Sequence, residues 1–251
     1  MVQAMQRILL IGATSAVAGS LARLYRAQGA HFYFLARSEA KLQPLLVEFG
    51  SSVVGSECLD FVDYDAGRQA IERAYERSGW FDLVVMAHGY LGDQLKSETD
   101  FDESLAQIAV NYCSVVTQLI VLSQKVEQHP ERTTQIAVLT SVAGDRGRPR
   151  NYTYGSAKGA LTLYLQGLRS RFWKRLTITT IKLGPVHSPM TVDHEKNALF
   201  VSSEAAARGI QRAILNKRGE VYVPSRWWWI MSVVKHLPEP LFQKFRFLAG
   251  R

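Results

Sequence analysis

Cysteine is scarce in this chain: its 251 residues include only two, Cys58 and Cys113. Disulfide-stabilised secreted domains and cysteine-rich metal sites use more cysteines at closer spacing. Both residues lie in apolar stretches, so we predict inert core thiols, no metal site and a reducing compartment. The opening MVQAMQRILLIG leaves too little room for the charged and apolar regions of a signal peptide. We therefore expect a cytoplasmic protein.

The chain also lacks a low-complexity tract, an internal repeat and a Gly/Ser-rich linker. Hydrophobic residues make up 47% of it and charged residues 21%, a composition that is typical of a folded globular protein and not of a disordered one. A chain of this length can bury one substantial core. We predict one domain over residues 1–222, followed by a C-terminal extension over residues 223–251.

Basic residues exceed acidic ones, which gives a formal net charge of +8, and the excess is unevenly distributed. Residues 217–251 hold seven Lys and Arg against two Glu, which is +5 of the +8. A nucleic-acid-binding module combines such charge with a reading helix or a fold signature, and the sequence shows neither. We expect no nucleic-acid partner, and the charge instead indicates an anionic substrate or a membrane surface.

Short apolar segments alternate with longer amphipathic segments along the chain. The short ones predict strands at residues 7–12, 31–36, 51–59, 81–87, 134–141, 176–184 and 220–224. The longer ones predict helices at residues 16–28, 38–49, 64–78, 99–127 with a bend, 152–173 and 203–216. Because LVVMA and IAVL are apolar on both faces, we predict an α/β fold with a doubly wound, seven-stranded parallel sheet and helices on both faces. Ligands of such sheets bind beyond the carboxyl ends of the strands.

Small residues follow the first predicted strand, in the run Gly12-Ala-Thr-Ser-Ala-Val-Ala-Gly19 that leads into a helix. Such a turn lets the backbone approach a pyrophosphate at the positive end of a helix dipole. The run does not match GxGxxG, so a simple tight turn stays open as the alternative. After the second strand comes Arg37, with no acid beside it. Arg37 is either a ligand of a 2′-phosphate, which favours NADP(H) over NAD(H), or an exposed residue that leads the next helix.

Three polar features occur further along the chain in a defined order. They are Asn111 in AVNYCS, Ser141 at the end of IAVLTS, and Tyr154 with Lys158 in YGSAK. Tyr154 and Lys158 are four residues apart and so share one helix face. Over about residues 7–215 the chain resembles the classical short-chain dehydrogenases/reductases. The residues that carry the resemblance are Gly12, Thr14, Ser15, Asp60, Asn111, Ser141, Tyr154 and Lys158.

The resemblance implies a Rossmann-type fold, an NADP(H)-dependent oxidoreductase and a role for each of these polar residues. Tyr154 is expected to donate a proton to a carbonyl, and Ser141 to hydrogen-bond the substrate oxygen. Lys158 is expected to hold the nicotinamide ribose and to lower the pKa of Tyr154, because an ammonium about 4 Å away contributes roughly 4 kcal/mol at an effective dielectric of about 20. Asn111 is expected to bend its helix and hold a water that supplies protons to the lysine.

The same resemblance implies a set of cofactor contacts, with Asp60 at the adenine. The full set is Gly12, Thr14, Ser15, Ala16, Val17, Arg37, Asp60, Phe61, Ala87, His88, Gly89, Tyr154, Lys158, Pro185, Val186 and Ser188. Three departures occur: alanines replace two glycines of the first turn, Ala-His-Gly replaces the family's Asn-Ala-Gly, and the proline-glycine pair before Val186 is reversed. His88 either lines the site or takes over a packing and hydrogen-bonding role.

The loop between the serine and the tyrosine carries Arg146, Arg148 and Arg150 at alternating positions. Two interpretations are open: the arginines bind a phosphate, or they form a solvated basic loop. The short segment 191–200 predicts an open cleft that admits a long or bulky ligand. The stretches AHGYLGDQ and VYVPSRWWWIMSVVKHLPEPLF resemble the decaprenylphosphoryl 2-keto-pentose reductases, which implies a ketone carried on a lipid phosphate.

Several functions and assemblies are compatible with these residues. The first is reduction of a ketone, such as a lipid-linked keto-sugar, with NADPH. The alternatives are a 3-ketoacyl-thioester reductase and, in another class, an NADP(H)-binding sensor without chemistry. Members of the family often form dimers or tetramers through the two long helices, so we expect a homodimer or a homotetramer.

Three consecutive tryptophans begin the apolar part of the C-terminal extension, in WWWIMSVV. Eight uncharged residues are far too few to cross a bilayer, which takes about 20. Tryptophans and basic residues favour the membrane interface, so we predict a hairpin of two short helices with two apolar patches on a membrane surface. The patches are Trp227–Val234 and Leu241–Leu248. The alternative is that these aromatics pack on the protein body, as a subunit contact or a wall of the substrate cleft.

Overall fold

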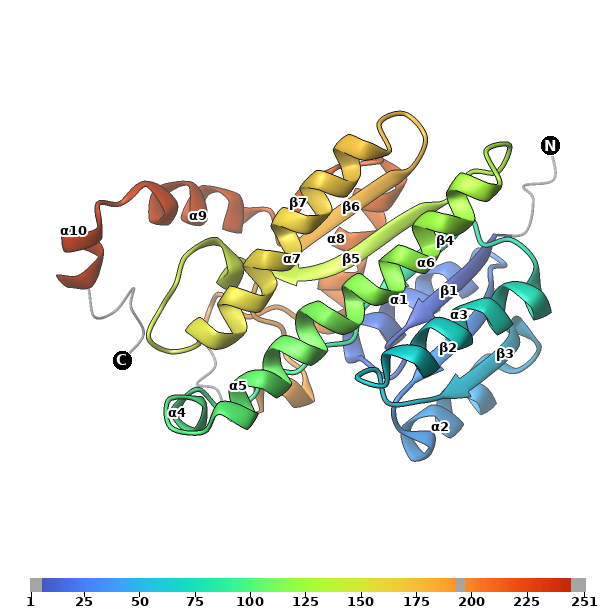
Figure 1. Ribbon diagram of the computed structural model, residues 1–251, viewed down its shortest axis with the longest axis horizontal. Coiled ribbons are helices and arrows are strands. Elements are labelled where there is room, and N and C mark those ends of the chain that lie inside the picture. The colour runs from blue at the N-terminus through green and yellow to red at the C-terminus, as the bar shows by residue number, and fades with distance from the viewer. Residues whose placement is uncertain (1–5, 193–196, 245–251) are drawn as a thin grey trace.

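A computed structural model describes residues 6–192 and 197–244 of the chain. Seven strands form one parallel sheet in the order β3-β2-β1-β4-β5-β6-β7 (Figure 1). All seven were predicted, and so was the fold class. The strands are β1 (Arg7–Ile11), β2 (His31–Ala36), β3 (Val53–Cys58), β4 (Leu83–Met86), β5 (Gln135–Ser141), β6 (Thr177–Leu183) and β7 (Glu220–Val223).

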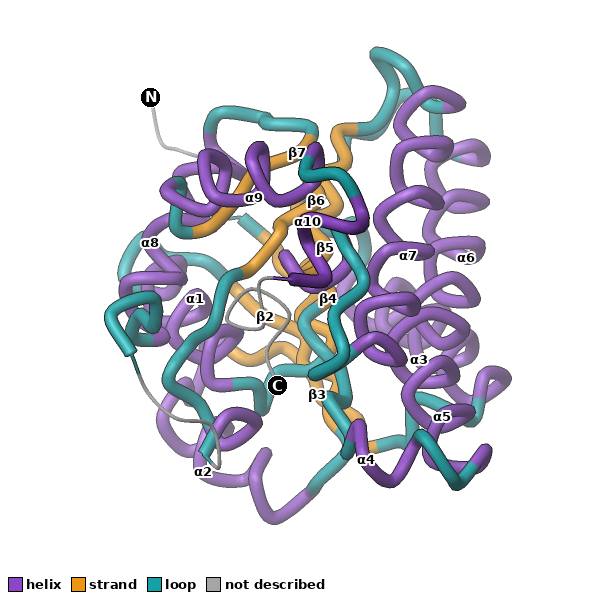
Figure 2. Tube along the Cα trace, turned by 90° about the vertical axis from the view of Figure 1, so that its left-hand side faces the viewer, coloured by secondary structure: helices purple, strands orange, loops and turns teal. Residues whose placement is uncertain are grey.

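Helices cover both faces of this sheet. In Figure 2 the strands run through the middle of the molecule, with α1, α2 and α8 on one side and α3, α6 and α7 on the other. The sequence predicted all of the helices between β1 and β7 except the short α4, with α5 and α6 as one bent helix. Their bounds are α1 (Ala16–Arg26), α2 (Glu39–Phe49), α3 (Tyr64–Ser78), α4 (Gln94–Ser97), α5 (Phe101–Ile108), α6 (Ser114–Gln128), α7 (Tyr152–Arg171) and α8 (Ser203–Leu215).

Successive residues of each central strand point into two different cores, as the pleat requires. In β1, Ile8 and Leu10 belong to the core beneath α1 and α8. Leu9 and Ile11 belong to the core beneath α3, α6 and α7. The sheet is therefore apolar on both faces, which is why its strands read as continuous hydrophobic runs.

Helices α5 and α6 are joined by a π-helical turn at Ala109–Cys113, where the sequence predicted a bend. Such a turn inserts an extra residue into the helix and is frequent at functional sites. The combined helix, 101–128, is long and apolar enough to cross a membrane by length and composition, and an 18-residue stretch of it has a mean hydropathy of 1.7. Leu119 and Leu122 are nevertheless buried in the second core, as in a core helix of a globular protein.

Cys58 corrects one prediction, because it is exposed and not in the core. It ends β3, which is an edge strand, and edge residues are covered on fewer sides. Partial burial and a hydrogen bond with Glu39 raise the pKa of its thiol to about 11. The thiol is therefore protonated near neutral pH, as expected of an inert cysteine.

A buried charge cluster fixes the loop that follows β5. Lys182 Nζ lies 2.7 Å from a carboxylate oxygen of Asp145 and 2.7 Å from one of Glu220. The side chains of Lys182 and Asp145 are each only 3% exposed. The Tyr222 hydroxyl donates to the second oxygen of Asp145 at 2.7 Å. The loop is thereby bound to the ends of β6 and β7.

Two C-terminal helices follow β7, α9 (Arg226–His236) and α10 (Glu239–Lys244), and Figure 1 shows them beyond the carboxyl ends of the strands. The predicted pair of short helices is confirmed within residues 226–244, whereas the rest of the second apolar patch, 245–248, lies outside the described residues. The buried residues of this region form what we call the tail cluster: Val142, Tyr222, Trp227, Met231, Val234 and Phe242. Trp228, Trp229 and Val233 are exposed, at 50%, 72% and 65%. Helix α9 is thus apolar on a buried inner face and on an exposed outer face.

Candidate active site

A cleft of about 1280 Å³ opens beyond the carboxyl ends of the strands. Ligands bind there in doubly wound sheets, where neighbouring connections run to opposite faces. Every predicted site residue except Asn111 lines this cleft: Gly12, Thr14, Ser15, Ala16, Val17, Arg37, Asp60, Phe61, Ala87, His88, Gly89, Ser141, Tyr154, Lys158, Pro185, Val186 and Ser188. The structure therefore brings together residues from six different strand ends.

Gly12 permits the turn between β1 and α1. Its φ of +85° lies in the left-handed region, and a β-carbon on it would lie 2.5 Å from the backbone nitrogen of His88. Ser15 occupies the N-cap of α1 without a side-chain capping bond. The first N–H groups of a helix have no intrahelical partner, so this end of α1 suits a pyrophosphate.

Two basic side chains line the cleft beyond the end of β2. Arg37 follows the strand directly, and Lys41 lies in the first turn of α2. Both are exposed, and both are suited to a 2′-phosphate. Sequence reasoning missed Lys41, because the sequence does not distinguish a lysine that faces the cleft from one on the solvated face of an amphipathic helix. Only the fold shows that the first turn of α2 lies at the cleft.

His88 packs in the site and also lines it, so both interpretations hold. Its ring stacks on Phe61 with centroids 4.5 Å apart, and its Nε2 lies 2.8 Å from Ser114 Oγ. Ser114 uses its own proton to bond the Val110 carbonyl at 2.8 Å, so Nε2 is the donor to Ser114. Burial, with a smaller contribution from the charge of Lys158, lowers the pKa of His88 to about 3. The imidazole is therefore neutral.

Tyr154 and Lys158 lie one turn apart on α7, beside Ser141 at the end of β5. The Lys158 ammonium donates to the Leu139 carbonyl at 3.2 Å and lies 5.9 Å from the Tyr154 ring centroid. Burial lowers the pKa of Lys158 to about 8. Burial also raises the pKa of Tyr154 to about 12, against the opposing effect of a hydrogen bond with Ser141.

The prediction that Lys158 lowers the pKa of Tyr154 below its ordinary value is therefore wrong for this structure. Removal of the phenol from water disfavours the phenolate more than its neighbours favour it. Tyr154 accordingly holds its proton at neutral pH. A protonated phenol is a proton donor, which is the form that reduction of a carbonyl requires.

Asn111 lies behind the cleft, fully buried in the π-helical turn. Its Nδ2 donates to the Tyr90 carbonyl at 2.6 Å and to the Gln107 carbonyl at 2.8 Å, and its Oδ1 accepts from the Tyr90 N–H at 3.1 Å. A β-carbon on Gly89 would lie 3.0 Å from Asn111 Oδ1 and 3.5 Å from Lys158 Nζ. Asn111 thus positions the loop after β4, and Gly89 leaves open the space between the amide and the lysine.

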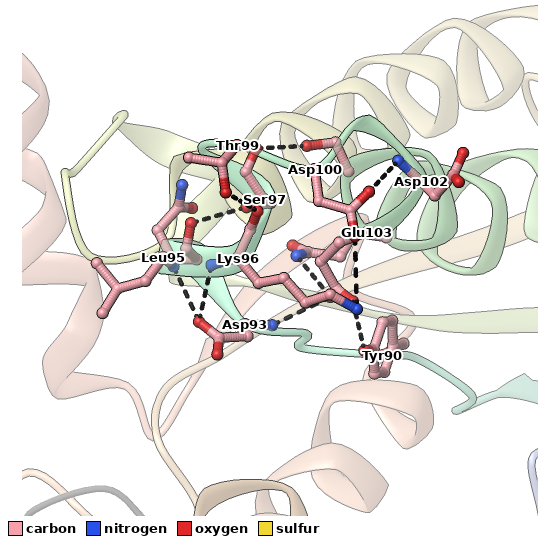
Figure 3. A network of polar contacts seen from close by, with 12 residues as sticks. Tyr90, Asp93, Leu95, Lys96, Ser97, Thr99, Asp100, Asp102 and Glu103 are labelled. Carbon is pink, nitrogen blue, oxygen red and sulfur yellow. Dashed lines mark hydrogen bonds and ion pairs between the residues drawn. The ribbon is translucent and has the colours of Figure 1, made fainter.

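Glu103 organises the same loop from α5, as Figure 3 shows. Its buried carboxylate accepts from the Tyr90 hydroxyl at 3.1 Å, the Asp93 N–H at 3.1 Å and the Gln107 amide at 3.2 Å. Tyr90 and Asp93 line the cleft, so this network shapes one wall of it. No sequence pattern marks a glutamate on a helix as buried, and this residue was not predicted.

The three loop arginines have different surroundings. Arg148 and Arg150 line the cleft, whereas Arg146 does not and instead contacts the C-terminal helices. Burial and the charge of Arg150 lower the pKa of Arg148. An anion bound in the cleft would offset both the burial of Arg148 and its repulsion by Arg150. Arg148 and Arg150 are therefore the candidate site for an acidic group of a ligand.

The inner face of α9 closes the same end of the cleft with four apolar side chains, those of Trp227, Ile230, Met231 and Val234. The alternative that the aromatic segment forms a wall of the substrate cleft therefore holds for this face. Sequence reasoning did not identify these four residues as part of the site, because the order of the tryptophans does not reveal which of them faces inward.

Three buried polar atoms in the cleft-lining residues have no hydrogen-bond partner among the described residues: His88 Nδ1, Arg148 Nε and Trp227 Nε1. A buried donor or acceptor that is left unpaired costs about 1–3 kcal/mol, so these three atoms are available to a ligand in the cleft. The uncapped start of α1 suits the pyrophosphate of a dinucleotide, and the apolar side chains of α9 suit an apolar group.

A doubly wound sheet with a serine, a tyrosine and a lysine together beyond its strand ends is the arrangement of an oxidoreductase of the Rossmann type. The chain belongs to the short chain dehydrogenase family, whose model matches residues 6–199. It is 27% identical over 244 residues to the "uncharacterized oxidoreductase in mprA 5'region" of Streptomyces coelicolor, with 94% of each chain covered.

Solved structures show the same fold. A short chain dehydrogenase from Burkholderia cenocepacia in complex with NADP superposes with a TM-score of 0.82 at 17% identity, covering 98% of both chains. A 3-ketoacyl-(acyl-carrier-protein) reductase from Brucella melitensis complexed with NADH superposes with a TM-score of 0.77 at 16% identity, covering 86% of this chain and 94% of the other.

The low pKa of His88 predicts a specific acid sensitivity. The unfolded chain binds a proton at His88 below about pH 6.5 and the folded one does not, so folding stability falls with pH from there toward about 3. Relative to His88→Asn, the wild-type protein should lose about 2 kcal/mol between pH 7.5 and pH 5. Urea unfolding at both pH values measures this loss, and the pH 7.5 comparison gives the cost of the substitution itself. Parallel losses in the two proteins would show that His88 is protonated in the folded state.

Proposed function

We propose that this protein reduces a ketone to a secondary alcohol with NADPH. The observation that carries the proposal is a partly buried, protonated Tyr154 between Ser141 and Lys158 at the inner end of the cleft. A binding protein without chemistry has no need to bury a lysine beside a tyrosine, so the arrangement supports catalysis over the sensor alternative.

In the proposed reaction the bound nicotinamide supplies a hydride to the carbonyl carbon. Ser141 donates a hydrogen bond to the carbonyl oxygen, and Tyr154 gives its phenolic proton to that oxygen as charge develops. Lys158 is mostly charged below its pKa of about 8 and stabilises the phenolate that forms. Asn111 and Gly89 keep the lysine open to a proton donor from the side of the π-helical turn.

A phosphate-bearing cofactor is favoured by the two basic side chains beyond β2. A guanidinium and an ammonium pair well with a 2′-phosphate, whereas a preference for NAD usually rests on a carboxylate at the end of this strand. The structural neighbours include complexes with NADP and with NADH, so the preference of this chain rests on Arg37 and Lys41.

The substrate that fits best is an amphiphilic ketone with an acidic group. Arg148 and Arg150 suit a phosphate or carboxylate, and the inner face of α9 suits an apolar chain. A lipid-linked keto-sugar carries a ketone, a phosphate and an apolar chain. The alternative is a 3-ketoacyl thioester, which is supported by the fold shared with the Brucella melitensis reductase. Turnover on a polyprenyl-phosphate keto-sugar and on an acyl-thioester ketone separates the two.

Tyr154→Phe tests the chemistry. The variant lacks the proton donor but keeps the ring, so NADPH binding should persist while the rate of ketone reduction falls by about 10²–10⁴. Binding is measured by NADPH fluorescence and turnover by the loss of NADPH absorbance in a ketone screen. Full activity in the variant would refute the assignment.

Arg37→Ser tests the cofactor preference. A charge-assisted hydrogen bond contributes about 1.5–3 kcal/mol, so kcat/KM for NADPH should fall about 10- to 100-fold. The value for NADH should stay within about twofold, because NADH has no 2′-phosphate for the arginine to bind. Equal losses with both cofactors would contradict a phosphate contact.

We further propose that the protein forms a homodimer or homotetramer.

We also propose that the outer face of α9 rests on a membrane surface. The exposed side chains of Trp228, Trp229 and Val233 suit the headgroup region, and nearby basic residues add attraction to anionic lipid. Peripheral contact on the cytoplasmic face would place the cleft near a substrate whose tail lies in the bilayer.

Trp228→Ser combined with Trp229→Ser tests this contact. The double variant should lose most of its sedimentation with vesicles made of equal parts of phosphatidylglycerol and phosphatidylcholine, because both indoles leave the interface. Trp173→Ser is the matched control, since Trp173 is 74% exposed and lies in the turn that follows α7. Equal sedimentation of the double variant and the wild type would exclude an interfacial role for α9.

A further inference from the structure

Arg146 joins the loop after β5 to the end of helix α9. Its side chain is only 13% exposed, and its Nη1 donates to the carbonyls of Leu237 at 2.6 Å, Val234 at 3.2 Å and Lys235 at 3.3 Å. The last carbonyls of a helix have no intrahelical partner, and the helix dipole is negative there. Arg146 therefore caps α9 from a part of the chain almost 90 residues away.

The same guanidinium also contacts α10. Its Nη2 donates to the Glu239 carboxylate at 2.9 Å, and its central carbon lies 4.4 Å from the ring centroid of Phe242, in cation–π geometry. Phe242 is 3% exposed and belongs to the tail cluster. One side chain thus holds both C-terminal helices.

The backbone that carries Arg146 is itself fixed. Its neighbour Asp145 is held by the buried ion pair with Lys182 and by the Tyr222 hydroxyl. At the other end of α9, the indole of Trp227 lies directly over Gly184, where a β-carbon would overlap it. Helix α9 is therefore attached at its N-terminal end by packing and at its C-terminal end by Arg146.

We propose that Arg146 is a positioning residue that holds α9 as one wall of the substrate end of the cleft. In that position, Trp227, Ile230 and Met231 of α9 select ketones that carry an apolar chain. The selection rests on the proposed function, since it concerns the ketone of that same site. Each CH₂ buried against the wall raises affinity by up to about fourfold. Arg146 itself touches neither the ketone nor the cofactor.

Arg146→Ala in the full-length protein tests this role with three measurements. Amide hydrogen exchange at residues 226–244 should become faster. The ratio of kcat/KM for methyl nonyl ketone to that for methyl ethyl ketone should fall on the order of tenfold or more. The dissociation constant for NADPH should stay within about twofold, because the pyrophosphate seat and Arg37 lie at the opposite end of the cleft.

Arg171→Ala is the matched control, because Arg171 also pairs with a glutamate, Glu127, at 2.8 Å and lies over an aromatic ring, that of Phe172, at 5.1 Å. It does not line the cleft, so its removal should leave the ketone ratio unchanged. Arg146→Lys keeps a positive charge at the carbonyls without the planar guanidinium and should give an intermediate ketone ratio. The lysine variant also tests the proposal if the alanine variant does not fold.

Two results would overturn the role of Arg146. One is an unchanged ketone ratio or unchanged exchange at residues 226–244 in Arg146→Ala. The other is a parallel loss of NADPH affinity and of both ketone activities, which indicates a general loss of structure. If the wild-type protein reduces neither of these two ketones, the exchange measurement decides whether Arg146 holds the helices, whereas the proposed function fails only if no ketone of the screen is reduced.

Discussion

The buried ion pair between Lys182 and Asp145 is the interaction on which the site most depends. Two charges removed from water attract each other strongly, and loss of Lys182 should cost about 3–5 kcal/mol because Asp145 would stay buried without its ion-pair partner. The pair fixes the loop that runs from Ser141 to Tyr154. The separation of Ser141 from Tyr154, the positions of the arginines that line the cleft and the attachment of the C-terminal helices all follow from where this loop lies.

Burial, more than charge, sets the ionisation of the site. An ammonium about 4 Å from a phenol contributes roughly 4 kcal/mol at an effective dielectric of about 20, and the attraction weakens with distance. Desolvation acts on every buried group at once, and here it keeps His88 neutral and Tyr154 protonated. At neutral pH Tyr154 is therefore available as a proton donor, while Lys158, whose pKa is lowered to about 8, is still mostly charged.

Sequence patterns predicted the sheet, most of its helices and the grouping of Ser141, Tyr154 and Lys158, because these depend on local periodicity and on the ends of strands. Strands buried on both faces are apolar throughout, and Tyr154 and Lys158 share a helix face by spacing alone. Contacts between segments that are distant in the sequence cannot be predicted from local periodicity. Nothing local separates Arg146, which binds α9, from Arg148, which lines the cleft, because their partners lie far along the chain. Cys58 was misplaced for a related reason: an apolar stretch does not show that its strand is at the edge of the sheet.

Helix α9 carries two proposed functions on two faces, an inner one at the cleft and an outer one at a membrane surface. Trp227 and Met231 face the cleft, while Trp228 and Trp229, which lie one to three positions from them in the sequence, face outward. Insertion of a single residue early in this helix would rotate the rest by about 100° and turn Trp229 and Val233 toward the cleft. Among relatives, the range of ketones accepted and the surface on which the protein rests should therefore change together, as one inherited trait carried by about three turns of helix.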